Sequence, residues 1–303
     1  MRFYQIFLSL VMVVVLMLFS PAGALASNQD SSQDLFKLAI KQLESDEYSA
    51  AIENLNQAIK INPNYTKAYY NRCLAFLHSE DYQHAIADCN TTLEQNPDFF
   101  EAYLNRGWAY YKLQLPAAAR GDFNYFLTSY PNDFRAYYDR GLTYFDEESY
   151  QKALSDYNKA LELIPEDKTQ LQVDIYNELG ETHLQLKNFE LAIKDFTSTI
   201  SLGVEDANSY CNRGYAFRQL KKYSEAIDDF TESIRLNRKQ GAAYVGRGFA
   251  FYKSGRHSEA SIDFLQAAEY FRDCGKMHQF HQIIYLIKIL RSQSPFTSKA
   301  LMT

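Results

Sequence analysis

The chain has 303 residues, of which 47% are hydrophobic and 22% are charged, and its formal net charge is −6. This balance lacks the basic footprint expected of a nucleic-acid-binding protein, and it says little else about a partner beyond favouring solubility. The aromatic content is unusual, because 24 Tyr and 21 Phe accompany a single Trp, Trp108. So many rings indicate either core positions that recur along the chain or an adhesive surface.

The first 26 residues differ sharply from the rest. One basic residue, Arg2, precedes an apolar run at 6–19, and the small-x-small pattern Ala24-Leu25-Ala26 follows. This order is typical of a secretory signal peptide, and the run is too short for a comfortable transmembrane helix of about 20 residues. We therefore expect a signal peptide at 1–26, a linker at 27–31, and export to the periplasm, the thylakoid lumen or the medium. Membrane association is expected only if the N-terminal segment stays uncleaved.

A repeat of 34 residues dominates the remaining chain. Its clearest marks are four prolines at this spacing, Pro63, Pro97, Pro131 and Pro165. Within the repeat an aromatic is followed by Arg and Gly, as in 102–107, and a downstream Ala is followed four residues later by Cys or an aromatic. Small and aromatic residues recur at helical spacing, which predicts two helices per repeat whose backbones approach closely at the small residues.

These motifs resemble the tetratricopeptide repeat family. One copy matches the family pattern through Tyr103, Gly107, Tyr110, Ala119, Phe123 and Pro131, with Phe126 where a small residue is usual. Seven copies begin near residues 32, 66, 100, 134, 173, 207 and 241. The resemblance implies an all-α, right-handed solenoid of about seven helix-turn-helix repeats with a C-terminal capping helix, in which neighbouring repeats bury one another's apolar faces.

The repeat register divides this solenoid. Gly180 follows Gly141 by 39 residues rather than 34, so five extra residues precede the fifth copy. We expect these residues to lengthen the first helix of that copy. The expected organisation is repeats 1–4 at 32–165, repeats 5–7 at 166–272, a capping helix at 273–291 and a loose tail at 292–303.

Charged residues recur in step with the repeat. An Arg in the first helix and an Asp in the second appear together as Arg72 with Asp88, Arg106 with Asp122, Arg140 with Asp156, Arg213 with Asp229, and Arg247 with Asp263. Recurrence once per helix pair indicates structural ion pairs, which fix geometry more than they add stability. The sequence shows no Ser-His-Asp set, acidic metal site or phosphate-binding loop. We therefore expect no enzymatic activity and no cofactor.

The first helix of each copy carries a second stripe, at repeat positions 2, 5, 9 and 12. In the family this stripe lines the concave surface, and Asn at position 6 often holds the backbone of an extended peptide, because an amide both donates and accepts. The resemblance therefore implies a peptide-binding groove made of Tyr70, Asn71, Asn105, Trp108, Tyr111, Tyr138, Asn212, Tyr215, Phe249 and Tyr252. The basic clamp with which some relatives hold a terminal carboxylate is not evident, since Glu101 and Asp139 occupy matching positions among neutral residues.

The expected function is that of a non-catalytic protein-interaction scaffold. It would bind an extended peptide or a helix of a partner protein in the concave groove, for example as an assembly factor. Two alternatives stay open. The solenoid could self-associate into a homo-oligomer through the same aromatics, or these rings could stack on the sugars of an envelope glycan. No nucleic-acid partner is expected.

Cysteine placement adds one further hypothesis. Cys73 and Cys89 occupy positions 8 and 24 of the second repeat, where other copies place Gly against an aromatic. These positions face each other across a helix pair, so an oxidising compartment would allow a disulfide, with two buried thiols as the alternative. Near the C-terminus, Cys274, His278 and His281 share one helical face, but three such ligands are a weak signal and we expect no metal site.

Overall fold

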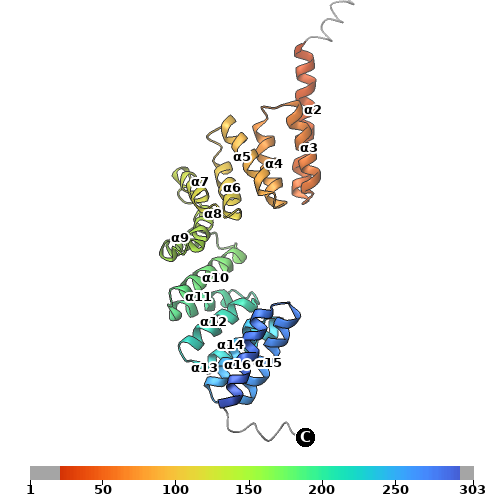
Figure 1. The fold of residues 1–303 in the computed structure, drawn as a ribbon. Helices are drawn as coiled ribbons and strands as arrows, with labels where there is room; N and C mark the ends of the chain where they lie inside the picture. The colour runs from red at the N-terminus through yellow and green to blue at the C-terminus, as the bar shows by residue number, and fades with distance from the viewer. Residues whose placement is uncertain (1–20, 294–303) are drawn as a thin grey trace, which may run out of the picture. The chain divides into compact units, whose positions relative to one another are not determined.

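The structure is a computed structural model that describes the backbone of residues 21–293 and the side chains of residues 31–290, and it is all-helical over that range (Figure 1). The predicted signal peptide up to residue 20 and the predicted tail from residue 294 lie outside the described residues. None of the described helices is long and apolar enough to cross a membrane. The helices are α2 (Pro21–Glu44), α3 (Tyr48–Ile61), α4 (Thr66–His78), α5 (Tyr82–Gln95), α6 (Phe100–Lys112), α7 (Pro116–Ser129), α8 (Phe134–Asp146), α9 (Tyr150–Leu163), α10 (Thr169–Gln185), α11 (Phe189–Ser201), α12 (Ala207–Gln219), α13 (Tyr223–Leu236), α14 (Gly241–Lys253), α15 (His257–Asp273) and α16 (Met277–Gln293).

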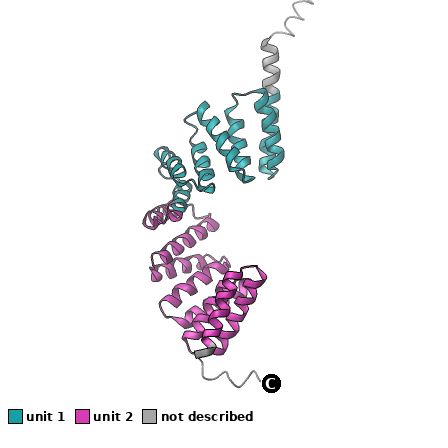
Figure 2. Ribbon diagram, viewed as in Figure 1, with its two compact units in different colours: residues 1–143 teal, residues 144–303 magenta. Residues whose placement is uncertain are grey.

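The helices belong to two compact units (Figure 2). Unit 1 ends at Thr143 and unit 2 begins at Tyr144, so the boundary falls within α8. In unit 1 the pairs α2–α3, α4–α5 and α6–α7 form, and each pair packs on the next. In unit 2 the pairs α10–α11, α12–α13 and α14–α15 do the same, and α16 packs on α15. Each pair corresponds to one predicted repeat, which confirms the all-α helical repeat fold.

Glycine permits the close approach of the two helices within a pair. A Cβ atom added to Gly107 would lie 2.7 Å from the ring of Phe123, and one added to Gly180 would lie 2.7 Å from the ring of Phe196. These separations are well below the roughly 3.5–4.0 Å at which carbon atoms pack. Both rings are fully buried. The small residue at position 8 is therefore required by the aromatic ring at position 24.

Two elements depart from the regular pattern. The helix α10 spans 17 residues, whereas the first helices α4, α6, α8, α12 and α14 each span 13. The four additional residues amount to about one helical turn, in line with the lengthening expected from the insertion. At the other end of unit 2, Ile283 and Ile287 of α16 are buried in one cluster with Phe264 and Ala268 of α15. The last repeat is therefore covered by α16.

Replacing Gly107 by Ala is expected to lower the free energy of unfolding of unit 1 by about 1–3 kcal/mol, because the new methyl group would overlap the ring of Phe123. The matched control is Gly121→Ala in α7, where an added Cβ meets nothing within 4 Å. There the higher helix propensity of Ala should add about 0.5–1 kcal/mol. Denaturant unfolding followed by circular dichroism measures both changes. Equal effects of the two substitutions would contradict the explanation by close approach.

Candidate functional site

An arginine in the first helix makes the strongest polar contacts of a repeat. Arg106 holds the carboxylate of Asp122 through two hydrogen bonds of 2.7 Å, the fork geometry that suits a guanidinium and a carboxylate. Burial raises the pKa of Asp122, and the hydrogen bond from Arg106 opposes that rise. The same geometry recurs in all four predicted pairs that lie within a single unit, Arg72–Asp88, Arg106–Asp122, Arg213–Asp229 and Arg247–Asp263.

These arginines also reach one repeat back, a contact that the repeat pattern had not suggested. Nη1 of Arg106 donates to Oδ1 of Asn90 at 2.6 Å, and Nη1 of Arg213 donates to the hydroxyl of Thr197 at 3.0 Å. The signal was present in the sequence, because an amide or hydroxyl recurs at repeat position 25 as Asn56, Asn90, Asn124, Thr197 and Thr231. Each of these arginines therefore links the first helix of its own repeat to the second helix of the preceding repeat.

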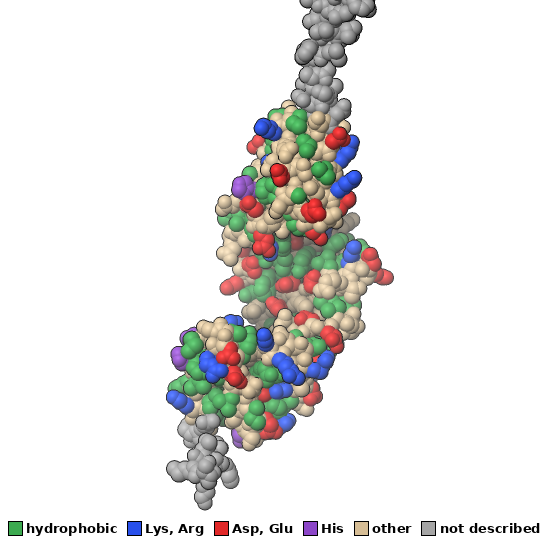
Figure 3. Space-filling view, turned by 90° about the vertical axis from the view of Figure 1, so that its right-hand side faces the viewer, with side chains coloured by type: hydrophobic (Ala, Val, Ile, Leu, Met, Phe, Trp, Pro, Cys, Tyr) green, Lys and Arg blue, Asp and Glu red, His purple; other side chains and the backbone are tan. Residues whose placement is uncertain are grey.

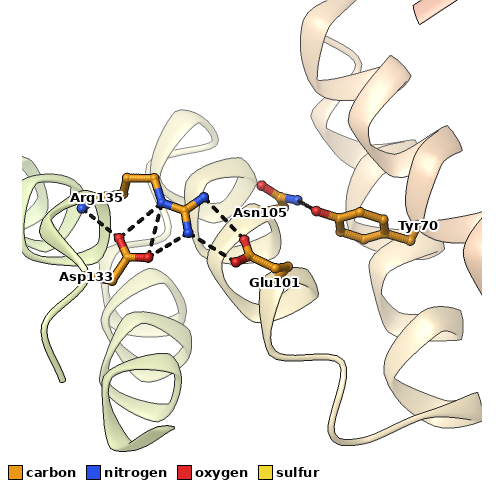
Figure 4. A network of polar contacts seen from close by, with 5 residues as sticks. All are labelled: Tyr70, Glu101, Asn105, Asp133 and Arg135. Atoms are coloured by element: carbon orange, nitrogen blue, oxygen red, sulfur yellow. Dashed lines mark hydrogen bonds and ion pairs between the residues drawn. The ribbon is translucent and has the colours of Figure 1, made fainter. Parts of the chain in front are cut away.

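In unit 1, the predicted groove residues lie on the first helices α4, α6 and α8. Asn105 on α6 donates to the hydroxyl of Tyr70 on α4 at 3.2 Å (Figure 4). The ring centroid of Trp108 lies 5.3 Å from that of Tyr111 and 4.8 Å from the ammonium of Lys112. The predicted residues of this unit, Tyr70, Asn71, Asn105, Trp108, Tyr111 and Tyr138, are all half-buried.

The two amides of this stripe have their nitrogens engaged. Asn71 donates to the carbonyl of Lys67 at 2.8 Å, within its own helix, and Asn105 donates to Tyr70. No donor among the described residues reaches either side-chain oxygen. Both oxygens can therefore accept a hydrogen bond from a ligand.

A charged cluster borders this stripe (Figure 4). Arg135, at the start of α8, donates to both carboxylate oxygens of Asp133 and to both of Glu101. The expectation of neutral residues beside Glu101 and Asp139 is therefore wrong at Arg135. The carboxylates of Asp133 and Glu101 compensate the charge of this arginine. Burial raises the pKa of Asp139 to about 7, and the positive charge of Arg135 opposes that rise.

In unit 2, the part of the corresponding stripe that lies on α10 carries acidic side chains. Asn212 on α12 donates to Oε1 of Glu181 at 3.1 Å, which is the counterpart of the contact between Asn105 and Tyr70. Burial first, and then the charges of Glu181, Asp146 and Asp174, raise the pKa of Glu178 to about 7. The remaining predicted residues are apolar rings, of which Tyr215 is 39% exposed and Phe249 and Tyr252 are half-buried.

Aromatic side chains also gather outside the predicted groove. Phe100, Tyr103, Tyr125 and Tyr130 form a cluster in unit 1, in which the rings of Tyr103 and Tyr125 lie 4.4 Å apart. Tyr125 and Tyr130 are 44% and 46% exposed. The sequence signal was Phe126, the departure from the family pattern, which stacks on Tyr130 at 5.0 Å.

On the face drawn in Figure 3, acidic and basic side chains are interspersed among hydrophobic ones in each unit.

The second repeat is cross-linked. Cys73 of α4 and Cys89 of α5 form a disulfide with Cα atoms 5.8 Å apart, and both residues are fully buried.

Of the free cysteines, Cys211 is buried, which raises the pKa of its thiol to about 11, and Cys274 is exposed. Within the described part of the chain, no group of three His, Cys, Asp or Glu side chains is placed to hold a metal ion.

The fifth repeat keeps the aspartate but lacks the arginine. Leu179 takes the position of the arginine, and Oδ2 of Asp195 is buried without a hydrogen-bond partner among the described residues. The imidazole of His183 lies 3.7 Å from this oxygen, but burial lowers the pKa of His183, so the ring is neutral at neutral pH and forms no full ion pair. Burial accordingly raises the pKa of Asp195 to about 6.

Four family models match the chain. One, described as tetratricopeptide repeat, matches residues 66–99, 134–167 and 207–240. Three more, described as TPR repeat or tetratricopeptide repeat, match residues 43–79, 101–133 and 173–202. None of the curated proteins matches the sequence.

Several solved structures share the fold at low identity. A tetratricopeptide repeat protein from Parabacteroides merdae is 21% identical, with a TM-score of 0.59 over 86% of this chain and 99% of its own. PilF of Pseudomonas aeruginosa is 16% identical, with a TM-score of 0.60 over 72% of this chain and 96% of its own. MamA from Desulfovibrio magneticus is 23% identical, with a TM-score of 0.53 over 57% of this chain and 96% of its own. At such identities the likeness shows the fold alone.

Reducing the Cys73–Cys89 disulfide, or replacing both residues by Ala, is expected to lower the free energy of unfolding of unit 1 by about 3 kcal/mol, the value for closing a loop of this length. Denaturant unfolding with and without reductant measures the difference. Cys274→Ser is the control, because that thiol is free and exposed. Thiol titration of the unfolded, unreduced protein should count two free cysteines, and a count of four would refute the disulfide.

Unit 2 is expected to lose stability through Asp195 as the pH rises. The pKa of this carboxyl is about 6 in the folded state and 3.8 when unperturbed, so the folded state binds the proton more tightly. The stability that unit 2 gains from this proton is fully present below about pH 4 and is lost as the pH rises through 6. Asp195→Asn should therefore stabilise unit 2 relative to wild type at pH 7 more than at pH 4, as measured by denaturant unfolding at both. A pH-independent difference between the two proteins would contradict the assignment.

Proposed function

Since the chain belongs to the tetratricopeptide repeat proteins, we propose that it is a protein-interaction scaffold that binds extended segments of partner proteins on the first-helix stripe of each unit. Repeat solenoids use such surfaces for binding. One observation carries the proposal for both units. On each stripe, partly exposed aromatic rings stand beside an asparagine whose nitrogen is held by the preceding repeat, Asn105 by Tyr70 and Asn212 by Glu181.

Unit 1 supports this proposal through ordered side chains. A half-buried ring such as Trp108, which contacts Tyr111 and Lys112, keeps its conformation while part of it stays open, so that binding a ligand costs little conformational entropy. The side-chain oxygens of Asn71 and Asn105 can accept hydrogen bonds from the N–H groups of an extended backbone. A backbone contact of this kind serves partners of any sequence, and the rings supply the preference for apolar side chains.

Unit 2 offers a surface of different chemistry. Its rings, Tyr215, Phe249 and Tyr252, lie on α12 and α14, and carboxylates of Glu178 and Glu181 lie on α10. A ligand of unit 2 must therefore tolerate negative charge at one side of the stripe. We expect the two units to prefer different segments.

The proposal places the protein outside the cytoplasm, as an assembly factor for exported proteins. The signal-peptide pattern at 1–26 supports export. The buried disulfide between Cys73 and Cys89 supports it independently, because disulfides persist in oxidising compartments such as the periplasm. The partner would then be another exported or envelope protein.

Self-association is the second candidate. Ile262 and Leu265 of α15 and Tyr285 of α16 are 59%, 45% and 67% exposed at the end of the repeat stack. Exposed apolar side chains at such an end favour contact with another copy. Sedimentation equilibrium decides this candidate, because a monomer at micromolar concentration excludes it, and a dimer that Tyr285→Ser dissociates supports it.

Photo-cross-linking tests peptide binding. Benzoylphenylalanine in place of Trp108 or Tyr215 is expected to cross-link to one defined segment of an envelope protein, whereas the same label in place of Tyr125, outside the stripe, is not. A synthetic peptide with the sequence of the segment captured at Trp108 should bind the wild type. Trp108→Ala should weaken that binding at least about tenfold, as buried aromatic anchors do at other interfaces.

Three results would count against the stripe. Cross-links from both stripe positions that reach only a second copy of the chain would favour self-association. A partner captured at Tyr125 alone would move the interface to the aromatic cluster of unit 1. A Trp108→Ala variant with unchanged circular dichroism and unchanged affinity for the captured peptide would remove Trp108 from the site.

A further inference from the structure

Arg218 is a guanidinium of unit 2 that the repeat network does not use. It stands on α12 at position 12 of the sixth repeat, on the same stripe as Tyr215. Its Cζ atom lies 5.1 Å from the ring centroid of Tyr215 and 5.5 Å from that of Phe249 on α14. The guanidinium therefore lies over the rings of two residues that the family resemblance assigned to the ligand groove.

A second arginine on the same helix shows what Arg218 lacks. Arg213 holds Asp229 through two hydrogen bonds of 2.8 and 2.7 Å and also donates to Thr197. In the part of the chain that the structure describes, no carboxylate pairs with Arg218, and its Nε is buried without any hydrogen-bond partner. Burial lowers the pKa of Arg218, and the titratable groups that act on it are Tyr215, Tyr223 and Cys211 rather than an acid.

An unpaired arginine in this position is costly for the fold. A guanidinium keeps its charge at every physiological pH, so a partly buried one that lacks a counter-charge loses hydration without compensation. Native structures pair such groups, and an exception therefore calls for a specific reason. Since Nε itself is closed to solvent, a ligand carboxylate at the terminal Nη groups would supply the missing counter-charge.

We propose that unit 2 holds a carboxylate of its partner segment at Arg218, with an apolar side chain of the same segment against Tyr215, Phe249 and Tyr252. The planar fork of an arginine matches the two oxygens of a carboxylate. The neighbouring rings suit an apolar residue close to it in the chain. This inference rests on the proposed peptide binding and adds the chemistry that the segment must carry.

The acidic part of the stripe, on α10, contacts α12 away from Arg218. Glu181 is joined to α12 through Asn212 at 3.1 Å, and Glu178 stands one turn earlier on the same helix. Burial raises the pKa of both carboxyls, and neither is among the titratable groups that act on Arg218. The preference for a carboxylate over a phosphate therefore rests on the neighbouring rings, which suit a singly charged group beside an apolar side chain.

Four small probes test the class of ligand on the full chain. Acetyl-Glu-Phe-amide carries a side-chain carboxylate, acetyl-Gln-Phe a terminal one and acetyl-Gln-Phe-amide none, while phenyl phosphate carries a phosphate. Binding is followed by the ¹⁵N–¹H resonance of Arg218 Nε. We expect a saturable shift with a carboxylate probe, and at least tenfold weaker binding of the amide and of phenyl phosphate. The tighter of the two carboxylate probes identifies the source as a side chain or a chain terminus.

Variants separate Arg218 from its surroundings. By saturation-transfer NMR, Arg218→Gln should bind the acid and amide probes equally, whereas Arg235→Gln, at an exposed arginine of α13 paired with Glu232, should keep the wild-type preference. Thermal unfolding gives an independent readout. Arg218→Gln should change the midpoint little, because it breaks no ion pair and removes only the contacts with the rings of Tyr215 and Phe249. Arg213→Gln should lower the midpoint clearly, because it leaves Asp229 unpaired.

Several results would overturn the role of Arg218. These are equal affinity of the wild type for acid and amide, tighter binding of phenyl phosphate, or a drop in the thermal midpoint of Arg218→Gln as large as that of Arg213→Gln. If a segment captured at Tyr215 binds Arg218→Gln as tightly as wild type, the scaffold function stands and this inference fails. If the probes bind as expected but no partner segment is captured, the anion site stands and the scaffold function fails.

Discussion

Two helices can approach as closely as they do within these pairs only where one of them presents no side chain to the other. At Gly107, Gly180 and Gly248 the absent Cβ leaves the space that a ring of the second helix fills. The ring is then buried inside the pair, and the apolar outer faces of the pair must be covered by the next one. The stripe of the first helix that carries the candidate binding residues is covered only in part by the pair and its stacking, because most of its side chains stay half-buried.

The arginine at position 7 adds a polar connection to this apolar stack. Its guanidinium holds an aspartate of its own repeat and an amide or hydroxyl of the preceding one, as Arg106 does with Asp122 and Asn90. The fifth repeat shows the arrangement without this connection. There Leu179 replaces the arginine, the carboxylate of Asp195 is poorly satisfied, and the first helix is one turn longer. The departure in helix length and the departure in polar contacts thus coincide in one repeat.

The repeat register was sufficient to predict the helix pairs, the Arg–Asp contacts and the facing positions of Cys73 and Cys89, because each depends on the geometry within one repeat. Contacts between repeats were harder to foresee. The hydrogen bond from Asn105 to Tyr70 and that from Asn212 to Glu181 depend on how successive repeats are rotated, which no spacing within a repeat reveals. The cluster around Tyr125 and the unpaired Arg218 depend on what surrounds a side chain in space, and so the repeat pattern did not predict them.

The bond between Cys73 and Cys89 spans the turn at residues 79–81, which joins α4 to α5. A protease that cut the backbone in that turn would divide the polypeptide but not the helix pair, since the two fragments stay joined through sulfur. A clipped molecule would then migrate as one chain until it is reduced, and its stack of repeats would keep the same core. At this turn of unit 1, continuity of the fold does not depend on continuity of the backbone.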